Sequence, residues 1–68
     1  MNGVFDWAYL DDVGNELGRS QAFDDADAAE EWMGRSWQDL AENGIEEVVL
    51  FDQGRGCHVY RMGLAAFD

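Results

Sequence analysis

The chain has 68 residues, and its fifteen Asp and Glu outnumber four Arg and no Lys, which gives a formal net charge of −11. Such a charge repels phosphate groups, so it argues against direct binding to nucleic acid or to an anionic membrane surface. It attracts basic proteins or divalent cations instead. A hydrophobic content of 47% exceeds that of an acidic disordered tail, so we expect one folded domain over residues 1–68.

The small size of the chain limits how it is stabilised. A domain of this length buries only about 60% of the surface that its unfolded chain exposes, and disulfides, metals or self-association usually assist it. Cys57 is the one cysteine and His58 the one histidine, so we expect no internal disulfide, no metal site and no cofactor. The first residues lack a basic region followed by an apolar run. We therefore expect no signal peptide, no membrane span and a cytoplasmic location.

The N-terminal segment predicts a β-hairpin. Residues 4–10 are rich in β-forming residues, residues 11–15 have turn chemistry, and residues 16–22 form a return strand that Gly18 interrupts. Alternation divides the side chains of the first strand between two faces, with Phe5, Trp7 and Tyr9 on one and Val4, Asp6, Ala8 and Leu10 on the other.

The middle of the chain predicts a helix from about Asp25 to Asn43. Asp24 or Asp25 serves as the N-cap, because an Asp side chain accepts hydrogen bonds from the free amides of the first turn. Gly44 ends the helix in a left-handed conformation. The apolar stripe of the helix consists of Ala26, Ala29, Met33, Leu40 and Ala41.

The C-terminal third predicts a second hairpin. Residues 45–52 form the strongest strand, residues 53–56 a turn, and residues 57–62 the return strand. The order of elements is therefore ββαββ. We predict an α+β fold, a four-stranded antiparallel sheet with one amphipathic helix packed on one face, which leaves the other face uncovered.

The uncovered sheet face is the candidate binding surface. The first and third strands carry large residues on both faces, and a contiguous exposed apolar patch usually marks an interface. We assign four aromatic residues and an acidic rim to this surface. The aromatic residues are Trp7, Tyr9, Phe51 and Tyr60, and the rim consists of Glu46, Glu47 and Asp52.

No catalytic arrangement is indicated. Adjacent residues of a strand point to opposite faces, so Cys57 and His58 cannot act as a nucleophile–base pair, and Glu46 and Glu47 do not converge either. We expect Cys57 to be a small buried hydrophobic residue. The prediction is that the protein is not an enzyme.

Several short segments, spread over most of the chain, share a pattern with other proteins. They are Trp7-x-Tyr9, residues 29–34 (AEEWMG), Trp37-x-x-Leu40, Gly44-Ile45, Val48-x-Leu50 and Val59-Tyr60-x-Met62. Together with the lysine-free, acidic composition, they resemble a group of small acidic proteins of unknown function from actinobacteria. The resemblance implies a bacterial cytoplasmic protein, and it brings no known activity, cofactor or functional residue.

Two functions are compatible with these observations. The leading hypothesis is a non-catalytic protein–protein interaction or regulatory module that uses the uncovered sheet face to bind a protein, either a basic partner or a second copy of the chain. The alternative is an acidic nucleic-acid mimic that sequesters a basic DNA- or RNA-binding protein. Salt distinguishes them, because a charge-based decoy releases its partner at high ionic strength.

Overall fold

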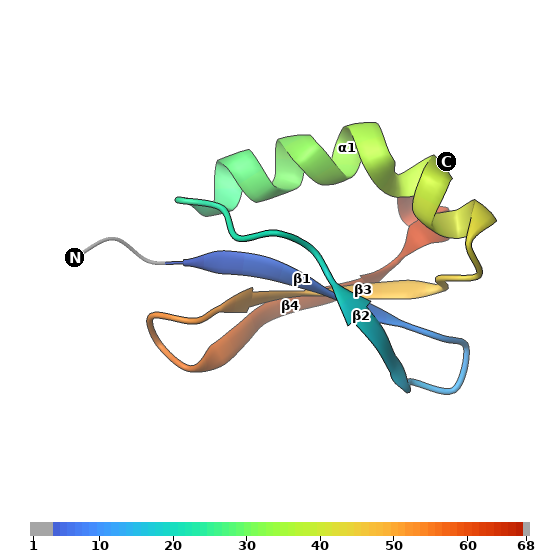
Figure 1. The fold of residues 1–68 in the computed structure, drawn as a ribbon, viewed down its shortest axis with the longest axis horizontal. Helices are drawn as coiled ribbons and strands as arrows, with labels where there is room; N and C mark the ends of the chain where they lie inside the picture. Colours follow the sequence, from blue (N-terminus) through green and yellow to red (C-terminus); the bar gives the residue numbers. More distant parts are fainter. Residues whose placement is uncertain (1–3, 68) are drawn as a thin grey trace.

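The computed structural model describes residues 4–67 and contains the predicted elements in the predicted order. The elements are β1 (Phe5–Leu10), β2 (Glu16–Arg19), α1 (Ala26–Glu42), β3 (Glu47–Asp52), β4 (Cys57–Gly63) and a 3₁₀ helix, η1 (Leu64–Phe67). The four strands form one antiparallel sheet in the order β2-β1-β3-β4. Helix α1 lies along one side of this twisted sheet (Figure 1). The predicted α+β fold is confirmed.

Both ends of α1 follow the sequence signals. The Asp25 carboxylate is the N-cap and accepts a hydrogen bond of 2.7 Å from the Ala28 amide. After the C-cap, Gly44 has a φ of +87°, a conformation that favours glycine, and the next residue, Ile45, is buried. In the predicted stripe, Ala29 is buried whereas Ala41 is exposed.

The segment that follows β2 runs back along β1. The Trp7 amide donates to the Ser20 hydroxyl and the Ser20 amide donates to the Trp7 carbonyl, both at 2.9 Å. Farther on, Phe5 and Phe23 exchange two backbone hydrogen bonds. Because the Ser20 side chain replaces a backbone acceptor, β2 ends at Arg19, earlier than the predicted residue 22.

The main core lies between the sheet and α1, and Trp7 is at its centre. The fully buried Trp7 indole donates a hydrogen bond of 2.9 Å to the carbonyl of Ala29 in α1. Its ring also meets the Tyr60 ring edge-to-face, with 5.9 Å between centroids. The buried members of this core are Trp7, Ala29, Met33, Ile45, Val48, Leu50 and Leu64.

A β-bulge determines which way β4 presents its side chains. Leu50 pairs with Tyr60, and the next residue, Phe51, pairs with His58, so Val59 is an extra residue in β4. Tyr60 therefore points toward α1. His58 and Arg61 both point to the opposite side of the sheet, although they are an odd number of positions apart.

Leu50 provides a test of the core. Leu50→Ala removes a fully buried side chain, so we expect the free energy of unfolding to fall by about 3 kcal/mol. Leu17→Ala makes the same change at a side chain that is 53% exposed, and we expect a change within about 0.5 kcal/mol. Urea denaturation followed by tryptophan fluorescence measures both. Equal effects of the two substitutions would contradict this description of the core.

Candidate functional site

The side of the sheet opposite α1, here called the open face, has an apolar centre between two arginines. One row of neighbouring residues crosses all four strands and consists of Arg19, Ala8, Val49 and Arg61. Leu10 packs with Ala8 and Val49, and Phe51 adjoins this small cluster. The open face therefore carries a second, smaller apolar cluster, which no helix or strand of residues 4–67 covers (Figure 1).

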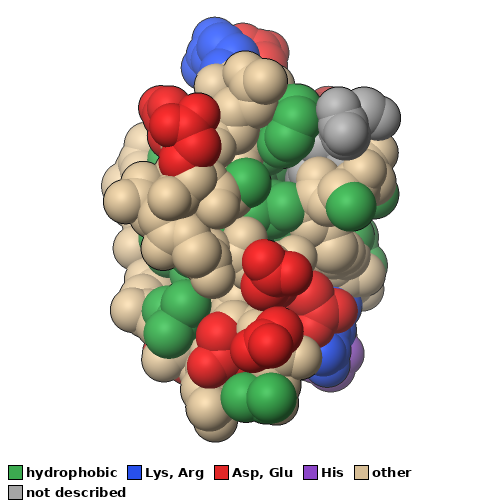
Figure 2. Space-filling view, turned by 90° about the vertical axis from the view of Figure 1, so that its right-hand side faces the viewer, with side chains coloured by type: hydrophobic (Ala, Val, Ile, Leu, Met, Phe, Trp, Pro, Cys, Tyr) green, Lys and Arg blue, Asp and Glu red, His purple; other side chains and the backbone are tan. Residues whose placement is uncertain are grey.

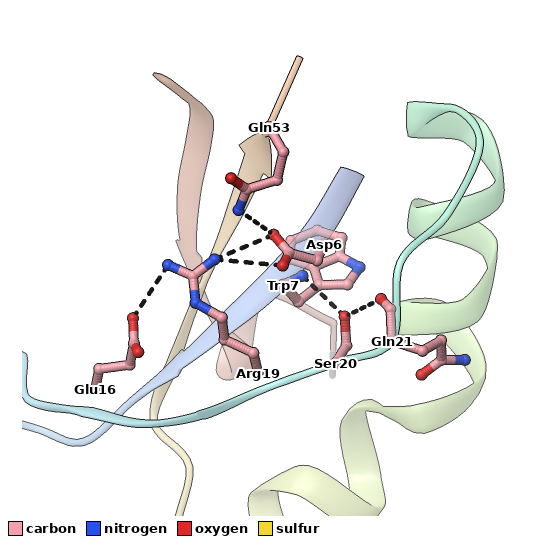
Figure 3. Close-up of polar contacts among 7 residues, drawn as sticks. All are labelled: Asp6, Trp7, Glu16, Arg19, Ser20, Gln21 and Gln53. Atoms are coloured by element: carbon pink, nitrogen blue, oxygen red, sulfur yellow. Dashed lines mark hydrogen bonds and ion pairs between the residues drawn. The ribbon is translucent and has the colours of Figure 1, made fainter. Parts of the chain in front are cut away.

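Arg19 forms one wall of the open face. Its guanidinium group lies 3.2 Å from Asp6 Oδ1 and 3.4 Å from Glu16 Oε1 (Figure 3). The Gln53 amide donates to the same Asp6 oxygen at 3.2 Å. The Arg19 guanidinium carbon also lies 4.7 Å from the centroid of the Phe51 ring, a cation–π distance. Arg19 thus connects β2 to β1 through Asp6, and its guanidinium group lies over the Phe51 ring.

Arg61 and His58 form the opposite wall. Arg61 Nε donates to Glu47 Oε2 at 3.2 Å, and this hydrogen bonding lowers the pKa of the Glu47 carboxyl. The His58 ring meets the Phe51 ring edge-to-face, with 6.1 Å between centroids. Long polar side chains from both outer strands therefore lie beside the apolar centre.

A hollow of about 270 Å³ lies between the two walls. It is lined by Ala8, Leu10, Glu16, Val49, Phe51, His58 and Arg61. Its floor is only slightly exposed, since Ala8 is 1%, Val49 8% and Leu10 9% accessible. The aliphatic stems of the wall residues Arg19 and Arg61 thus shield the floor from water at its sides. The result is a hollow with a largely buried floor rather than the contiguous exposed apolar patch that we expected.

The prediction that four aromatic residues share the uncovered face is wrong. Only Phe51 lies there, whereas Trp7, Tyr9 and Tyr60 point toward α1 and belong to the main core or pack against it. Trp7 is completely buried, so it is not available to a partner. The reason is alternation: Trp7 and Tyr9 share a face with Phe5, and the face that α1 covers is theirs.

The predicted acidic rim is likewise divided. Glu47 lies on the open face, but Glu46 lines a hollow on the side of α1. Asp52 is 8% exposed, and its carboxylate accepts a hydrogen bond from the Arg55 amide in the β3–β4 turn. Cys57 is exposed rather than buried, because it lies at the start of the edge strand β4.

The sequence reasoning missed the basic side chains of the open face, Arg19, His58 and Arg61. Arg19 belongs to the predicted second strand, but the sheet face on which its side chain lies depends on the register between β2 and β1, which the sequence does not show. His58 and Arg61 share a face only because of the bulge at Val59. A usable signal was present in β1, where Ala8 and Leu10 alternate with the larger Trp7 and Tyr9.

Negative charge gathers at one end of the molecule (Figure 2). Each of the four arginines forms an ion pair with a carboxylate of the chain. The last turn of α1 contains no basic residue, although cations are favoured at the C-terminal end of a helix. It contains the acidic residues Asp39 and Glu42 instead. Figure 2 views the end of the molecule with the β1–β2 turn and the C-terminal end of α1, where Asp and Glu side chains gather and basic ones lie at the margins.

Comparison of the chain with protein-family models, with curated proteins and with solved structures finds no match. The resemblance to acidic actinobacterial proteins thus stays a prediction. Across residues 4–67, no helix has both the length and the apolar character that crossing a membrane requires.

Arg19 provides a test of the open-face wall. Arg19→Gln removes the ion pairs with Asp6 and Glu16 and the cation–π contact with Phe51, so we expect the free energy of unfolding to fall by about 1 kcal/mol. Arg35→Gln is the matched control, because it makes the same charge change and breaks only an exposed pair with Glu31, for which we expect about 0.5 kcal/mol or less. Urea midpoints measure both. A larger effect at Arg35 would contradict the proposed role of Arg19.

Tyr60 provides a test by pH. Burial and the hydrogen bond that its hydroxyl donates to Glu30 raise the pKa of Tyr60 above the ordinary value of 10, and burial raises that of Tyr9. Above pH 10 the unfolded chain therefore binds fewer protons than the folded chain, so stability decreases as the pH rises. We expect a late phenolate absorbance in the native protein and a smaller alkaline loss of stability in Tyr60→Phe. Native tyrosines that titrate at the ordinary value would refute this.

Proposed function

We propose that the protein is a non-catalytic interaction module that binds a partner protein through the open face. In this proposal an apolar side chain of the partner enters the hollow over Ala8 and Val49, and Arg19 and Arg61 form its polar rim. The observation that carries the proposal is an apolar floor that is covered by no element of the described chain and is flanked by two arginines. Interface centres are typically apolar, and arginine is enriched there.

The charge distribution supports the choice of this face. Its arginines offset part of the charge of Asp6, Glu16 and Glu47, so it repels an acidic partner less than the rest of the surface does. A second copy of the chain, itself strongly acidic, meets the least repulsion here. The acidic surroundings accelerate the approach of a basic partner, because electrostatic complementarity acts mainly on association rate.

A second candidate function is an acidic decoy for a basic nucleic-acid-binding protein. It is favoured by the carboxylates of α1 and of the end shown in Figure 2, most of which have no basic side chain of residues 4–67 within ion-pair distance. Asp39 and Glu42 lie near the negative end of the helix dipole, where they oppose helix stability. Such a surface presents a dense field of negative charge to a cationic groove.

Salt and two variants distinguish these functions. We expect self-association in sedimentation experiments, or partner capture from cell lysate by the tagged chain, to persist in about 1 M salt, where charges more than about 3 Å apart are screened. Phe51→Ser removes the aromatic ring at the edge of the hollow and is expected to abolish this association. Val13→Ser is the control, because it also replaces an apolar side chain by serine, at a position in the β1–β2 turn that is 75% exposed and does not line the hollow.

Each outcome decides between the functions. Association that resists salt, fails in Phe51→Ser and survives in Val13→Ser supports the open face. A basic partner that salt removes equally from all variants supports the decoy and contradicts the open face. Circular dichroism verifies folding, and Val49→Thr, which adds a hydroxyl at nearly constant shape, replaces Phe51→Ser if the latter unfolds.

A further inference from the structure

The side of the molecule that carries α1 has a groove of its own, independent of the open face. Two hollows lie between α1 and the chain from β4 into η1. The first, of about 280 Å³, is lined by Trp7, Glu30, Tyr60 and Met62. The second, of about 260 Å³, includes Trp37, Ala41, Glu46 and Gly63 in its lining.

The two hollows are consecutive along both elements. Glu30, Trp37 and Ala41 are separated by seven and four residues, spacings that place them on one face of a helix. On the other side, Met62 lines the first hollow and its neighbour Gly63 lines the second. We call this feature the α1–β4 groove and define it by Glu30, Trp37, Glu46, Tyr60 and Met62.

The first hollow combines a carboxylate with an aromatic ring. Tyr60 donates its hydroxyl hydrogen to Glu30 Oε2 at 2.8 Å, which holds the carboxylate beside the ring. Glu30 is exposed and forms no ion pair with a basic side chain of the described residues. A half-buried aromatic ring, the Met62 thioether and a fixed negative charge together favour a cation with a planar or apolar body.

The second hollow repeats this chemistry. The half-buried Trp37 indole lines it from α1, and the exposed Glu46 lines it from the segment before β3. The Glu46 carbonyl accepts a hydrogen bond from the Leu64 amide at 3.0 Å, which joins this segment to η1. The nearby C-terminal end of α1, marked by Gly44, adds partial negative charge. A second cationic group is therefore favoured here.

The spacing of the hollows defines the ligand. Glu30 and Trp37 lie about 10 Å apart along the helix axis, at 1.5 Å per residue. In an extended polyproline-type segment, side chains three residues apart point the same way and are separated by about 9 Å. Guanidinium groups stack on aromatic rings and pair with carboxylates better than ammonium groups do.

We infer that the α1–β4 groove binds an extended segment of a basic protein by two arginine side chains three residues apart. One arginine enters the hollow of Tyr60 and Glu30, and the other enters the hollow of Trp37 and Glu46. The net charge of −11 attracts such a segment, and the groove gives it a fixed position. The inference does not depend on the open face, which lies on the other side of the sheet.

The test uses the full chain, labelled with ¹⁵N, and the peptide acetyl-RAAR-amide as the probe. We expect chemical shift changes at the Trp37 indole and at the amides of Tyr60 and Met62, and a binding isotherm for one peptide per chain. Glu30→Gln and Glu46→Gln should each weaken binding by about tenfold, the effect of losing one charge-assisted hydrogen bond. The peptide acetyl-QAAQ-amide should not bind.

Two controls separate the groove from the general field of the protein. Glu42→Gln removes the same charge from an exposed site on another face of α1, and it should leave affinity within about twofold. Tyr60→Phe keeps the ring and should retain binding, whereas Tyr60→Ser should lose it. Equal weakening by Glu42→Gln and Glu30→Gln, or shift changes spread over the acidic surface, would overturn the inference. The open-face variant Phe51→Ser should bind the peptide normally, so failure of either proposal is distinguishable from failure of the other.

Discussion

The hydrogen bond from the Trp7 indole to the Ala29 carbonyl determines how the rest of the molecule is arranged. It joins the central strand β1 to α1 at 2.9 Å, deep in the core, and the small Ala29 side chain allows this close approach. A buried indole N–H needs an acceptor, and leaving it unpaired would cost about 1 to 3 kcal/mol. Because side chains alternate along a strand, placing Trp7 under the helix sends Ala8 to the other side. The open face and the α1–β4 groove both follow from this placement of Trp7.

The open face is stable in water because polar side chains cover part of its apolar cluster, as a second helix would in a three-layer protein. Arg19 spans from Asp6 to the ring of Phe51, and Arg61 is held by Glu47, so their stems cover the sides of the apolar floor. Exposed ion pairs contribute little individually. Their effect here is steric and geometric, since they narrow the apolar surface to a hollow of about 270 Å³. A partner that binds this face displaces or joins these side chains and gains the apolar contact beneath them.

The sequence predicted the elements well and their faces poorly, and the difference has a physical cause. Caps and turns are local, so Asp25 and Gly44 indicated the limits of α1 correctly. The choice of the covered face is not local. Both faces of β1 and β3 contain apolar residues, and alternation does not tell which of them meets the helix. The helix packs on the face with Trp7 because the larger side chains of that face bury more apolar surface and so contribute more free energy. The bulge at Val59 was also invisible, since it depends on the register between β3 and β4.

The α1–β4 groove is a consequence of covering four strands with one helix. A helix with its side chains is about 10 Å wide, and strands are spaced by about 4.8 Å, so α1 shields roughly two strands. The contact of Trp7 with Ala29 draws the helix over β1, in the middle of the sheet. On one flank, the segment that carries Ser20 and Phe23 runs along β1 and leads into α1. On the other flank, Tyr60 and Met62 of β4 line one hollow with Trp7 and Glu30, and the second hollow lies between Trp37 of α1 and Gly63 at the end of β4. The hydrogen bond to Glu30 stabilises the neutral hydroxyl of Tyr60, which is why it raises the tyrosine pKa, and it holds the Glu30 carboxylate beside the ring. This carboxylate has no cation of the described residues within ion-pair distance, and a guanidinium group that enters the hollow supplies one.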